Sequence, residues 1–143
     1  MKYFTIILIS LFTLNLTAQC KKCTSISEAA KEPLKVVSLQ VNPYLGGEPL
    51  HKFPMQVLEM KNLKILYLTD QNIREVPEGL GKLQNLDELS ISGCPITEIP
   101  DDIFELKDLK EMVLYDTKFS EKYKKEIIKR FKKELPKTKL LID

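Results

Sequence analysis

One pair of residues has a spacing that could support redox or metal chemistry. Cys20 and Cys23 are separated by two lysines, the spacing of redox-active dithiols and of many metal ligands. A thioredoxin-like dithiol lies at the start of a helix that follows a strand, whereas this pair lies in an N-terminal segment. A zinc site needs two further ligands, which the neighbouring sequence does not supply. We therefore expect neither redox nor metal chemistry from these cysteines.

The remaining candidate residues lack the companions of a catalytic site. His51 is the sole histidine and has no evident cysteine or serine partner. Asp101 and Asp102 directly follow Pro100, where acidic side chains favour the start of a short helix. The sequence therefore predicts a protein that is not an enzyme and that holds no cofactor and no metal.

The first 18 residues have the pattern of an export signal. Lys2 precedes an apolar run that ends near Phe12, and Ala18 is a small residue where a signal peptidase would cut. Ser10 and Thr13 interrupt the run, so it is too short to span a bilayer comfortably. We expect residues 1–18 to be a signal peptide and the protein to be secreted or associated with the cell envelope.

Cys20 leaves the fate of the exported chain open. After cleavage behind Ala18, Cys20 and Cys23 could form a structural disulfide in an oxidising compartment. Lipidation of Cys20 would instead tether the protein to a membrane, although Gln19 stands where lipoprotein processing usually has Gly, Ala or Ser. Free secretion, a lipid anchor and the redox state of the pair therefore remain open at this point.

Composition and charge fit one ordinary folded domain. The chain has 143 residues, of which 43% are hydrophobic and 29% charged, and its net charge of +2 excludes no class of partner. Basic residues gather between Lys118 and Lys139, where ten lysines and arginines stand against three glutamates. This segment could bind a polyanion or an anionic lipid surface, or form the solvated face of a helix. The export signal argues against nucleic acid as the partner.

The middle of the chain repeats with a period of 23 residues. Apolar residues with LxxLxL spacing begin at Leu63, Leu86 and Leu109, and Val76-Pro77 recurs one period later as Ile99-Pro100. The alternation of apolar and polar residues predicts a half-buried strand in each unit, and the half with the proline predicts a return segment. Because one unit cannot bury its apolar face alone, the units must stack into one parallel sheet.

An earlier unit has the same two halves but is longer. Leu34, Val37 and Leu39 fit the LxxLxL spacing, and Phe53-Pro54 fits the return half. The segment from Pro43 to Pro49 makes this unit six residues longer, and its glycines and prolines predict a looped-out insertion. The insertion is either a tolerated variation in length or a part of a binding surface.

These units resemble the leucine-rich-repeat family, in a bacterial secreted or envelope type with units LxxLxLxx(N/C)xLxxLPxxLxxLxx. The resemblance covers residues 34–119 as four repeats, at 34–62, 63–85, 86–108 and 109–119. It implies an α/β fold, a short right-handed solenoid with a parallel concave sheet. The family's ninth position is usually Asn, and here it holds Asn42, Gln71, Cys94 and Thr117. We therefore expect a weakened or differently wired asparagine ladder, with Cys94 buried and inert.

Helical caps are expected at both ends of the solenoid. In residues 19–33, Ser25 and Glu28 have capping-box spacing and Pro33 ends the helix. In residues 120–143, a helix begins at Ser120, ends at Pro136 and is followed by a closing strand at Leu140-Leu141-Ile142. The apolar stripe of this helix should dock onto the last repeat and consists of Tyr123, Ile127, Ile128, Phe131 and Leu135.

Strand alternation places a defined set of side chains on the concave face. Because Leu66 and Leu68 point inward, the residues between and beside them must point to solvent. The concave set is Val36, Ser38, Gln40, Ile65, Tyr67, Thr69, Glu88, Ser90, Ser92, Glu111, Val113 and Tyr115. Exposed aromatic residues are enriched at binding hot spots, although sheets also favour them without a partner.

These features together predict a non-enzymatic, monomeric module that binds a protein or peptide on its concave face. The alternative is an envelope-surface lipoprotein or polyanion-binding protein, tethered by Cys20 or by the basic C-terminal helix. The identity of the ligand is not encoded in any of these patterns.

Overall fold

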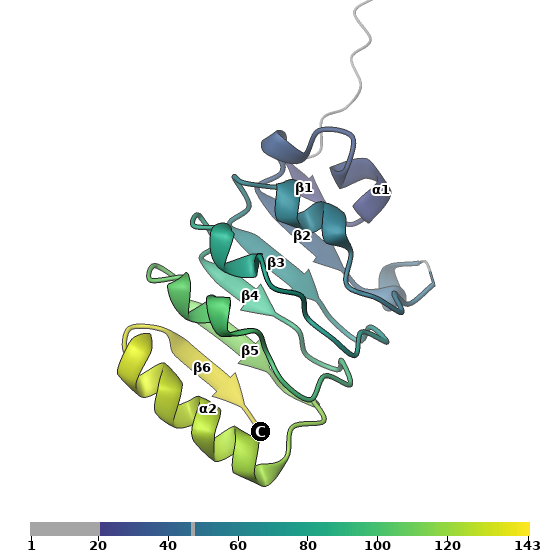
Figure 1. The fold of residues 1–143 in the computed structure, drawn as a ribbon. Helices are drawn as coiled ribbons and strands as arrows, with labels where there is room; N and C mark the ends of the chain where they lie inside the picture. Colours follow the sequence, from purple (N-terminus) through teal and green to yellow (C-terminus); the bar gives the residue numbers. More distant parts are fainter. Residues whose placement is uncertain (1–20, 47) are drawn as a thin grey trace, which may run out of the picture.

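The computed structural model describes residues 21–46 and 48–143, and its strands form one parallel sheet (Figure 1). The predicted signal peptide and Cys20 lie outside the described residues. The strands lie side by side in sequence order: β1 (Lys22–Cys23), β2 (Ser38–Val41), β3 (Ile65–Leu68), β4 (Glu88–Ser90), β5 (Glu111–Leu114) and β6 (Lys139–Ile142). Each successive unit therefore adds one strand to the same edge of the sheet, as stacking of the repeats requires.

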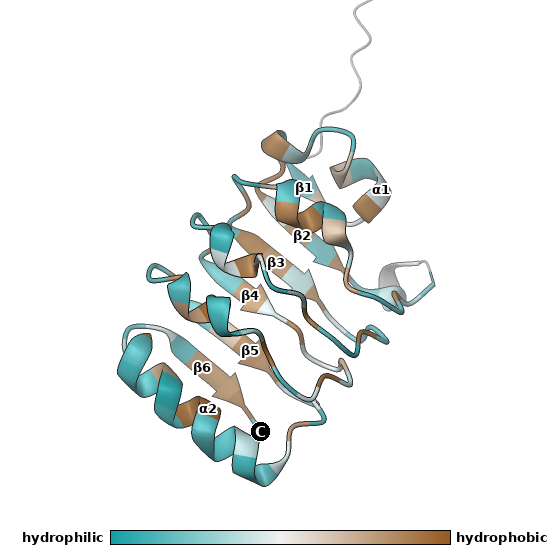
Figure 2. Ribbon diagram, in the orientation of Figure 1, coloured by the Kyte–Doolittle hydropathy of each residue, from teal (hydrophilic) through white to brown (hydrophobic). Residues whose placement is uncertain are grey.

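The strand register stacks equivalent apolar residues into a continuous core. Leu39, Leu66, Leu89 and Met112 are partners in neighbouring strands, and none of these side chains is exposed. Leu68, Ile91 and Leu114 form a second buried set. Figure 2 shows the apolar residues on the strands and on the turns that face them, whereas the C-terminal helix is largely hydrophilic.

Short 3-10 helices return the chain across one face of the sheet (Figure 1). They are η3 (Met55–Glu59), η4 (Leu80–Lys82) and η5 (Asp101–Glu105), each with one or more buried residues. The turns η4 and η5 touch, since a Cβ added to Gly81 would clash with the carbonyl oxygen of Asp102. Only glycine permits this close approach of two backbones.

The pairing of β2 with β3 corrects the first repeat. Leu39 lies opposite Leu66, so Val36 corresponds to Leu63 and is buried, with 1% of its surface exposed. Leu34 is 61% exposed and lies in the 3-10 helix η1 (Pro33–Lys35). The prediction that Val36 lies on the concave face was wrong, and the repeat begins two residues after Leu34. Both alignments preserve strand alternation, so only the contacts with β3 distinguish them.

The same shift shortens the insertion and changes the role of Asn42. The first unit now runs over residues 36–62 and is four residues longer than the 23-residue units, not six. Asn42 lies at the end of β2, before the 3-10 helix η2 (Pro43–Leu45), where its side chain accepts a hydrogen bond from the Tyr44 amide at 2.8 Å. Asn42 is therefore a local turn residue and not a member of the asparagine ladder.

The ladder positions of the later units link neighbouring turns with other side chains. The Gln71 side chain is buried, accepts from the Leu50 amide at 2.7 Å and donates to the Thr69 carbonyl at 2.7 Å. The buried Cys94 thiol donates to the Leu68 carbonyl at 3.2 Å. The Thr117 hydroxyl is buried and has no hydrogen-bond partner among the described residues. The ladder is therefore rewired, as the loss of asparagine predicts.

The N-terminal helix is shorter than its sequence pattern suggests. The helix α1 covers only Ile26–Ala29, and Ser25 precedes it without a side-chain capping bond. The Ser25 hydroxyl instead lies 2.8 Å from that of Ser27, so the predicted capping box with Glu28 does not form. The two-residue strand β1 extends the sheet on this side and was not predicted.

The C-terminal helix packs on the last return turn through aromatic contacts. The helix α2 covers Glu121–Glu134, and the Ser120 hydroxyl accepts a hydrogen bond from the Tyr123 amide at 3.2 Å. Phe131 packs edge-on against Phe104 of η5, with ring centroids 5.2 Å apart. The Arg130 guanidinium lies 4.0 Å from the centre of the Phe104 ring. These contacts hold α2 against η5, and β6 follows α2 in the chain and joins the sheet beside β5.

Candidate functional site

The best candidate site is the face of the sheet opposite the return turns, called here the open face. It consists of Ser38, Gln40, Ile65, Tyr67, Thr69, Glu88, Ser90, Ser92, Glu111, Val113 and Tyr115, together with Lys139 and Leu141 of β6. The strand register arranges these residues in rows across the sheet. One row runs from Ile65 through Glu88 and Glu111 to Lys139. The sheet therefore brings together residues that lie far apart in the sequence.

Lys139 and Leu141 are members of this face that the sequence analysis missed. Lys139 pairs with Glu111 in the strand register, and Leu141 pairs with Val113. The alternation around Leu140 and Ile142 predicts a strand, and residues of the opposite parity must then face outward. The signal for these two residues was therefore present, but it depended on β6 joining the sheet in parallel.

A hydrogen bond and an ion pair link the two acidic residues of the open face to side chains of neighbouring strands. The Tyr67 hydroxyl donates a hydrogen bond to a carboxylate oxygen of Glu88. The Lys139 ammonium lies 2.9 Å from a carboxylate oxygen of Glu111. Each acid of this face therefore has a partner on an adjacent strand.

The hydrogen bond to Glu88 also changes the acidity of Tyr67. This bond, with partial burial and the negative charges of Glu88 and Glu111, raises the pKa of Tyr67 from 10.0 to about 12. The Tyr67 side chain therefore stays protonated and continues to donate at every physiological pH.

Two of the three serines of the open face are less accessible than strand alternation suggests. Ser38 and Ser90 are buried, with 3% and 7% of their surfaces exposed. Ser90 lies in register between the larger residues Tyr67 and Val113, and its hydroxyl is 3.3 Å from that of Ser92. Ser38 and Ser90 therefore contribute little surface for a partner to contact.

Four apolar residues of the open face, Ile65, Tyr67, Val113 and Tyr115, are at least partly exposed. Tyr115 is 40% exposed, which is high for a large apolar side chain. Ile65 and Tyr67 of β3 and Val113 of β5 are half-buried, and β4 lies between these two strands. An apolar strip with acidic and basic residues beside it is the composition found at protein interfaces.

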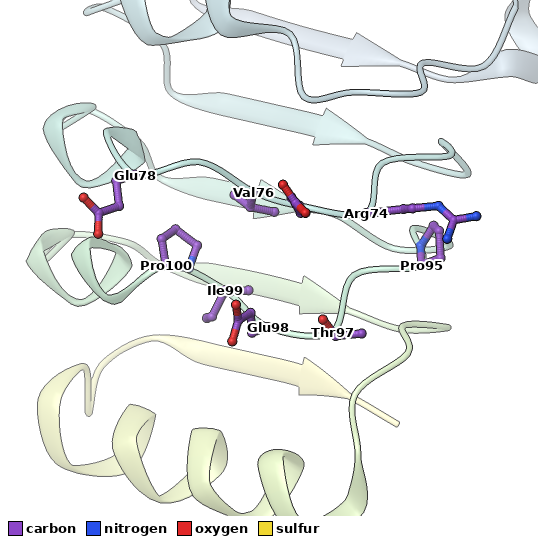
Figure 3. Close-up of a pocket in the computed structure, with 9 residues that line it drawn as sticks. Arg74, Val76, Glu78, Pro95, Thr97, Glu98, Ile99 and Pro100 are labelled. Carbon is purple, nitrogen blue, oxygen red and sulfur yellow. The ribbon is translucent and has the colours of Figure 1, made fainter.

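Apart from the open face, a groove lies between the return segments that follow β3 and β4 (Figure 3). It has a volume of about 440 Å³ and includes Val76, Pro95, Ile99 and Pro100 in its lining. Figure 3 shows Arg74 and Glu78 toward opposite ends of this groove. Glu75 and Glu98 also line it, so the groove combines a mainly acidic set of side chains with apolar ones.

The two adjacent aspartates have structural contacts. The Asp102 carboxylate accepts hydrogen bonds from the amides of Gly79 at 2.5 Å and Gly81 at 3.1 Å. Asp101 forms an ion pair with Arg130 at 2.5 Å. His51 is exposed at the side of the solenoid, in a return segment. These contacts hold return turns and α2 together, and they explain the acidic residues without an acid–base role.

The cysteines differ in their surroundings. Cys23 is buried and disulfide-bonded, whereas Cys94 is a buried free thiol. Burial raises the pKa of the Cys94 thiol, which makes it a poor nucleophile. The predicted pairing of Cys23 with Cys20 has one member outside the described residues and stays a prediction.

No group of three or more His, Cys, Asp or Glu side chains within residues 21–46 and 48–143 is placed to hold a metal ion. Within the same residues, no helix has the length and apolar character that crossing a bilayer requires.

Comparisons with known proteins agree with this architecture. The family model described as Leucine Rich Repeat matches residues 85–106, the segment that contains β4 and η5. A leucine-rich-repeat protein of Leptospira interrogans has a similar solved structure, with a TM-score of 0.66 and 27% sequence identity. The match covers 82% of this chain but only 28% of the Leptospira protein. No curated protein sequence matches this chain significantly.

Proposed function

Because this chain is a leucine-rich-repeat protein, we propose that it is a non-enzymatic module that binds a protein or peptide on the open face of its sheet. Solenoids of this kind present an extended concave surface to their partners. The fold alone does not establish the function, so the proposal rests on the residues of that face. The observation that carries it is the accessible strip of Ile65, Tyr67, Val113 and Tyr115.

This strip has the properties of a binding surface. Tyrosine supplies a large contact area at a low cost in conformational entropy, and Tyr115 is 40% exposed. The row of Glu88, Glu111 and Lys139 crosses the sheet beside the strip. A partner with an apolar segment flanked by polar and charged groups would complement this arrangement.

The form of the solenoid is part of the proposal. We propose that it is right-handed, because connections between parallel neighbouring strands are right-handed in nearly all proteins. We also propose that α1 and α2 act as caps, since Ile127 and Phe131 of α2 are buried at one end of the core and Ala29 of α1 at the other.

Removal of the two tyrosines of the strip tests the proposal. The mature chain and the double variant Tyr67→Ala/Tyr115→Ala would be compared in affinity capture from envelope and culture-medium extracts. Met55→Ala is a matched control, because Met55 is 55% exposed but lies in the return turn η3. We expect a partner that the natural chain and the control retain and that the double variant loses, with a similar melting temperature for all three. Equal capture by all three chains would refute the proposal.

A second proposal concerns location. We propose that the chain is exported and remains free or is held at the envelope by lipid on Cys20, because the first 18 residues have the pattern of a signal peptide. Mass spectrometry of the mature N-terminus distinguishes the two states. A chain that begins at Gln19 indicates free secretion, a diacylated Cys20 indicates anchoring, and an intact Met1 would contradict export.

A further inference from the structure

The basic residues of the chain are concentrated around the C-terminal helix α2. Between residues 118 and 139 lie ten of the 22 lysines and arginines but only three of the 20 acidic residues. The remainder of the chain carries 17 acidic and 12 basic residues and is therefore acidic overall. The small net charge of +2 thus results from two regions of opposite sign. A region of one sign attracts partners of the other sign and repels those of its own.

One side of α2 is formed by exposed lysines. Ile127 and Phe131 of this helix are buried in the core. With about 3.6 residues per turn, residues two positions away from Ile127 or Phe131 lie on the side of the helix that faces away from the core. These residues, called here the outer lysines, are Lys125, Lys129 and Lys133, and all three are exposed.

The charges of the outer lysines are not neutralised within residues 21–46 and 48–143. No acidic oxygen of these residues lies within 4.0 Å of the three ammonium groups. The glutamates of α2 instead contact other basic residues, in the pairs Glu121–Lys124, Glu126–Lys122 and Glu134–Arg130. The outer side of α2 therefore presents uncompensated positive charge to its surroundings.

The outer lysines and the open face lie on opposite sides of the sheet. The helix α2 lies on the same side of the sheet as the return turns η3, η4 and η5 (Figure 1). Since Ile127 and Phe131 of α2 face the core, the outer lysines point away from the sheet. Figure 2 shows largely hydrophilic residues along the visible side of α2. A surface in contact with the outer lysines therefore leaves the open face uncovered.

We propose that the outer lysines attach the chain to a membrane surface that carries anionic phospholipid headgroups, with the open face directed away from the membrane. The ammonium groups donate hydrogen bonds to the phosphate oxygens of the headgroups. The outer lysines bring no apolar side chain to insert among the lipid tails, so charge holds the contact and salt weakens it. This site is separate from the open face and does not depend on the function proposed for that face.

The arrangement of charge favours a membrane surface over a single anionic molecule. The outer lysines extend over about 12 Å on the convex side of the helix, so their ammonium groups can meet a planar surface together. Flexible lysine stems adapt to headgroups that move within a bilayer, whereas recognition of one fixed phosphate or carboxylate favours the planar fork of arginine. The acidic remainder of the chain is repelled by an anionic surface, which favours one orientation of the bound molecule.

Co-sedimentation with vesicles tests the attachment. The chain that begins at Gln19 and carries no lipid is mixed with vesicles of phosphatidylcholine, or of equal parts of phosphatidylcholine and phosphatidylglycerol. We expect the chain to sediment only with the vesicles that contain phosphatidylglycerol. The bound fraction should fall as the ionic strength rises from about 0.1 M to about 1 M, because the Debye length shortens from about 10 Å to about 3 Å. Equal recovery with both kinds of vesicle would refute attachment by charge.

Substitutions on α2 locate the contact. Lys125→Gln/Lys129→Gln removes two outer charges and keeps good helix formers, so the affinity for the phosphatidylglycerol vesicles should fall about thirtyfold. Lys125→Arg/Lys129→Arg keeps both charges and should bind like the natural chain. Lys31→Gln/Lys61→Gln removes the same charge at exposed positions outside the basic region and should change the affinity little. Circular dichroism checks that each variant is folded, and equal weakening by the two glutamine pairs would contradict a site on α2.

Acetylation of lysines, followed by mass spectrometry, tests the orientation. Lys22 pairs with Ser38 and Lys139 with Glu111 in the strand register, so both lysines lie on the open face, and both are exposed. The phosphatidylglycerol vesicles should protect the outer lysines from brief acetylation and leave Lys22 and Lys139 reactive. Protection of Lys22 and Lys139 in place of the outer lysines would put the open face against the membrane and overturn the proposal.

Two further measurements separate this site from other anionic partners and from the open face. Inorganic polyphosphate and a polyglutamate peptide are added to the natural chain in place of vesicles. Binding to either probe without binding to the phosphatidylglycerol vesicles would assign the outer lysines to a soluble polyanion or an acidic protein and overturn the proposal. Tyr67→Ala/Tyr115→Ala should bind the vesicles like the natural chain, whether or not it loses a protein partner, and a loss of vesicle binding would place the membrane contact on the open face.

Discussion

At the scale of single residues, the open face depends on contacts between neighbouring strands. Tyr67 and Glu88 come from β3 and β4, and their hydrogen bond joins an aromatic residue of the strip to the acidic row beside it. Each residue alone has an ordinary side chain for a strand. The bond between them gives the face a fixed donor and a fixed acid, and it raises the pKa of the phenol.

The raised pKa of Tyr67 gives a prediction with a definite sign. The folded chain holds the Tyr67 proton up to about pH 12, whereas the unfolded chain releases it near 10.0. Unfolding is therefore accompanied by proton release in this interval, and the free energy of unfolding should fall as pH rises from 10.0 to about 12. Below pH 10.0 the Tyr67 proton is bound in both states and contributes no slope.

The absorbance of tyrosinate measures the pKa of Tyr67 directly. The difference between the titrations of the natural chain and Tyr67→Phe isolates Tyr67 among the five tyrosines. Glu88→Gln should move the midpoint of Tyr67 down toward 10.0, because the largest cause of the shift is the bond to Glu88. A Tyr67 midpoint that Glu88→Gln leaves unchanged would show that this bond does not set the acidity.

At the scale of elements, the return turns are joined by one carboxylate. The Asp102 side chain in η5 accepts from the amides of Gly79 and Gly81, which lie beside and within η4. The same residue appeared in the sequence as half of an acidic pair. The position of this pair after Pro100, at the start of a short helix, was predictable, but the bonds of Asp102 to the preceding unit depend on the stacking of the turns.

Replacement of Asp102 tests the joint between these turns. Asp102→Ala leaves two backbone amides without their acceptor, so we expect a loss of about 2–3 kcal/mol in the free energy of unfolding. Asp102→Asn keeps one acceptor oxygen and should lose less. Asp108→Ala, at an exposed position in the same repeat, is the control and should change stability little. Urea denaturation followed by circular dichroism provides the measurement, and equal stability of all three variants would contradict the role of Asp102.

At the scale of the whole molecule, the sheet is a stack in which each strand contacts only its immediate neighbours. Leu89 lies in the middle of this stack, between Leu66 and Met112, and is fully buried. Phe131 lies at one end, where α2 packs on η5. When each unit contacts only its neighbours, a cavity in a central unit destabilises the whole stack. A cavity at one end destabilises the terminal elements first.

Two cavity variants should therefore differ in which elements unfold. Leu89→Ala should lower the free energy of unfolding by about 3 kcal/mol and keep a single cooperative transition. Phe131→Ala should speed amide hydrogen exchange in α2 and β6 more than in β3 and β4. Hydrogen exchange with mass spectrometry distinguishes the two patterns. Uniform acceleration across the sheet in Phe131→Ala would contradict a stack of locally coupled units.

The sequence by itself determined the repeat, its strands and most of the open face. A period of 23 residues and strict strand alternation place Ile65, Glu88 and Glu111 on one side of the sheet, because a side chain's direction in a strand depends only on parity. The burial of Cys94 and the closing strand at Leu140-Leu141-Ile142 follow from the same local patterns.

The tertiary structure decided between alternatives that fit the local sequence patterns equally well. Leu34 and Val36 both begin an acceptable LxxLxL segment, and only pairing with β3 buries Val36 and exposes Leu34. The place of Lys139 beside Glu111 likewise depends on how the last strand meets the sheet. Strand parity fixes which face a side chain occupies, but register and the ends of the stack are set by contacts between units that lie far apart in the chain.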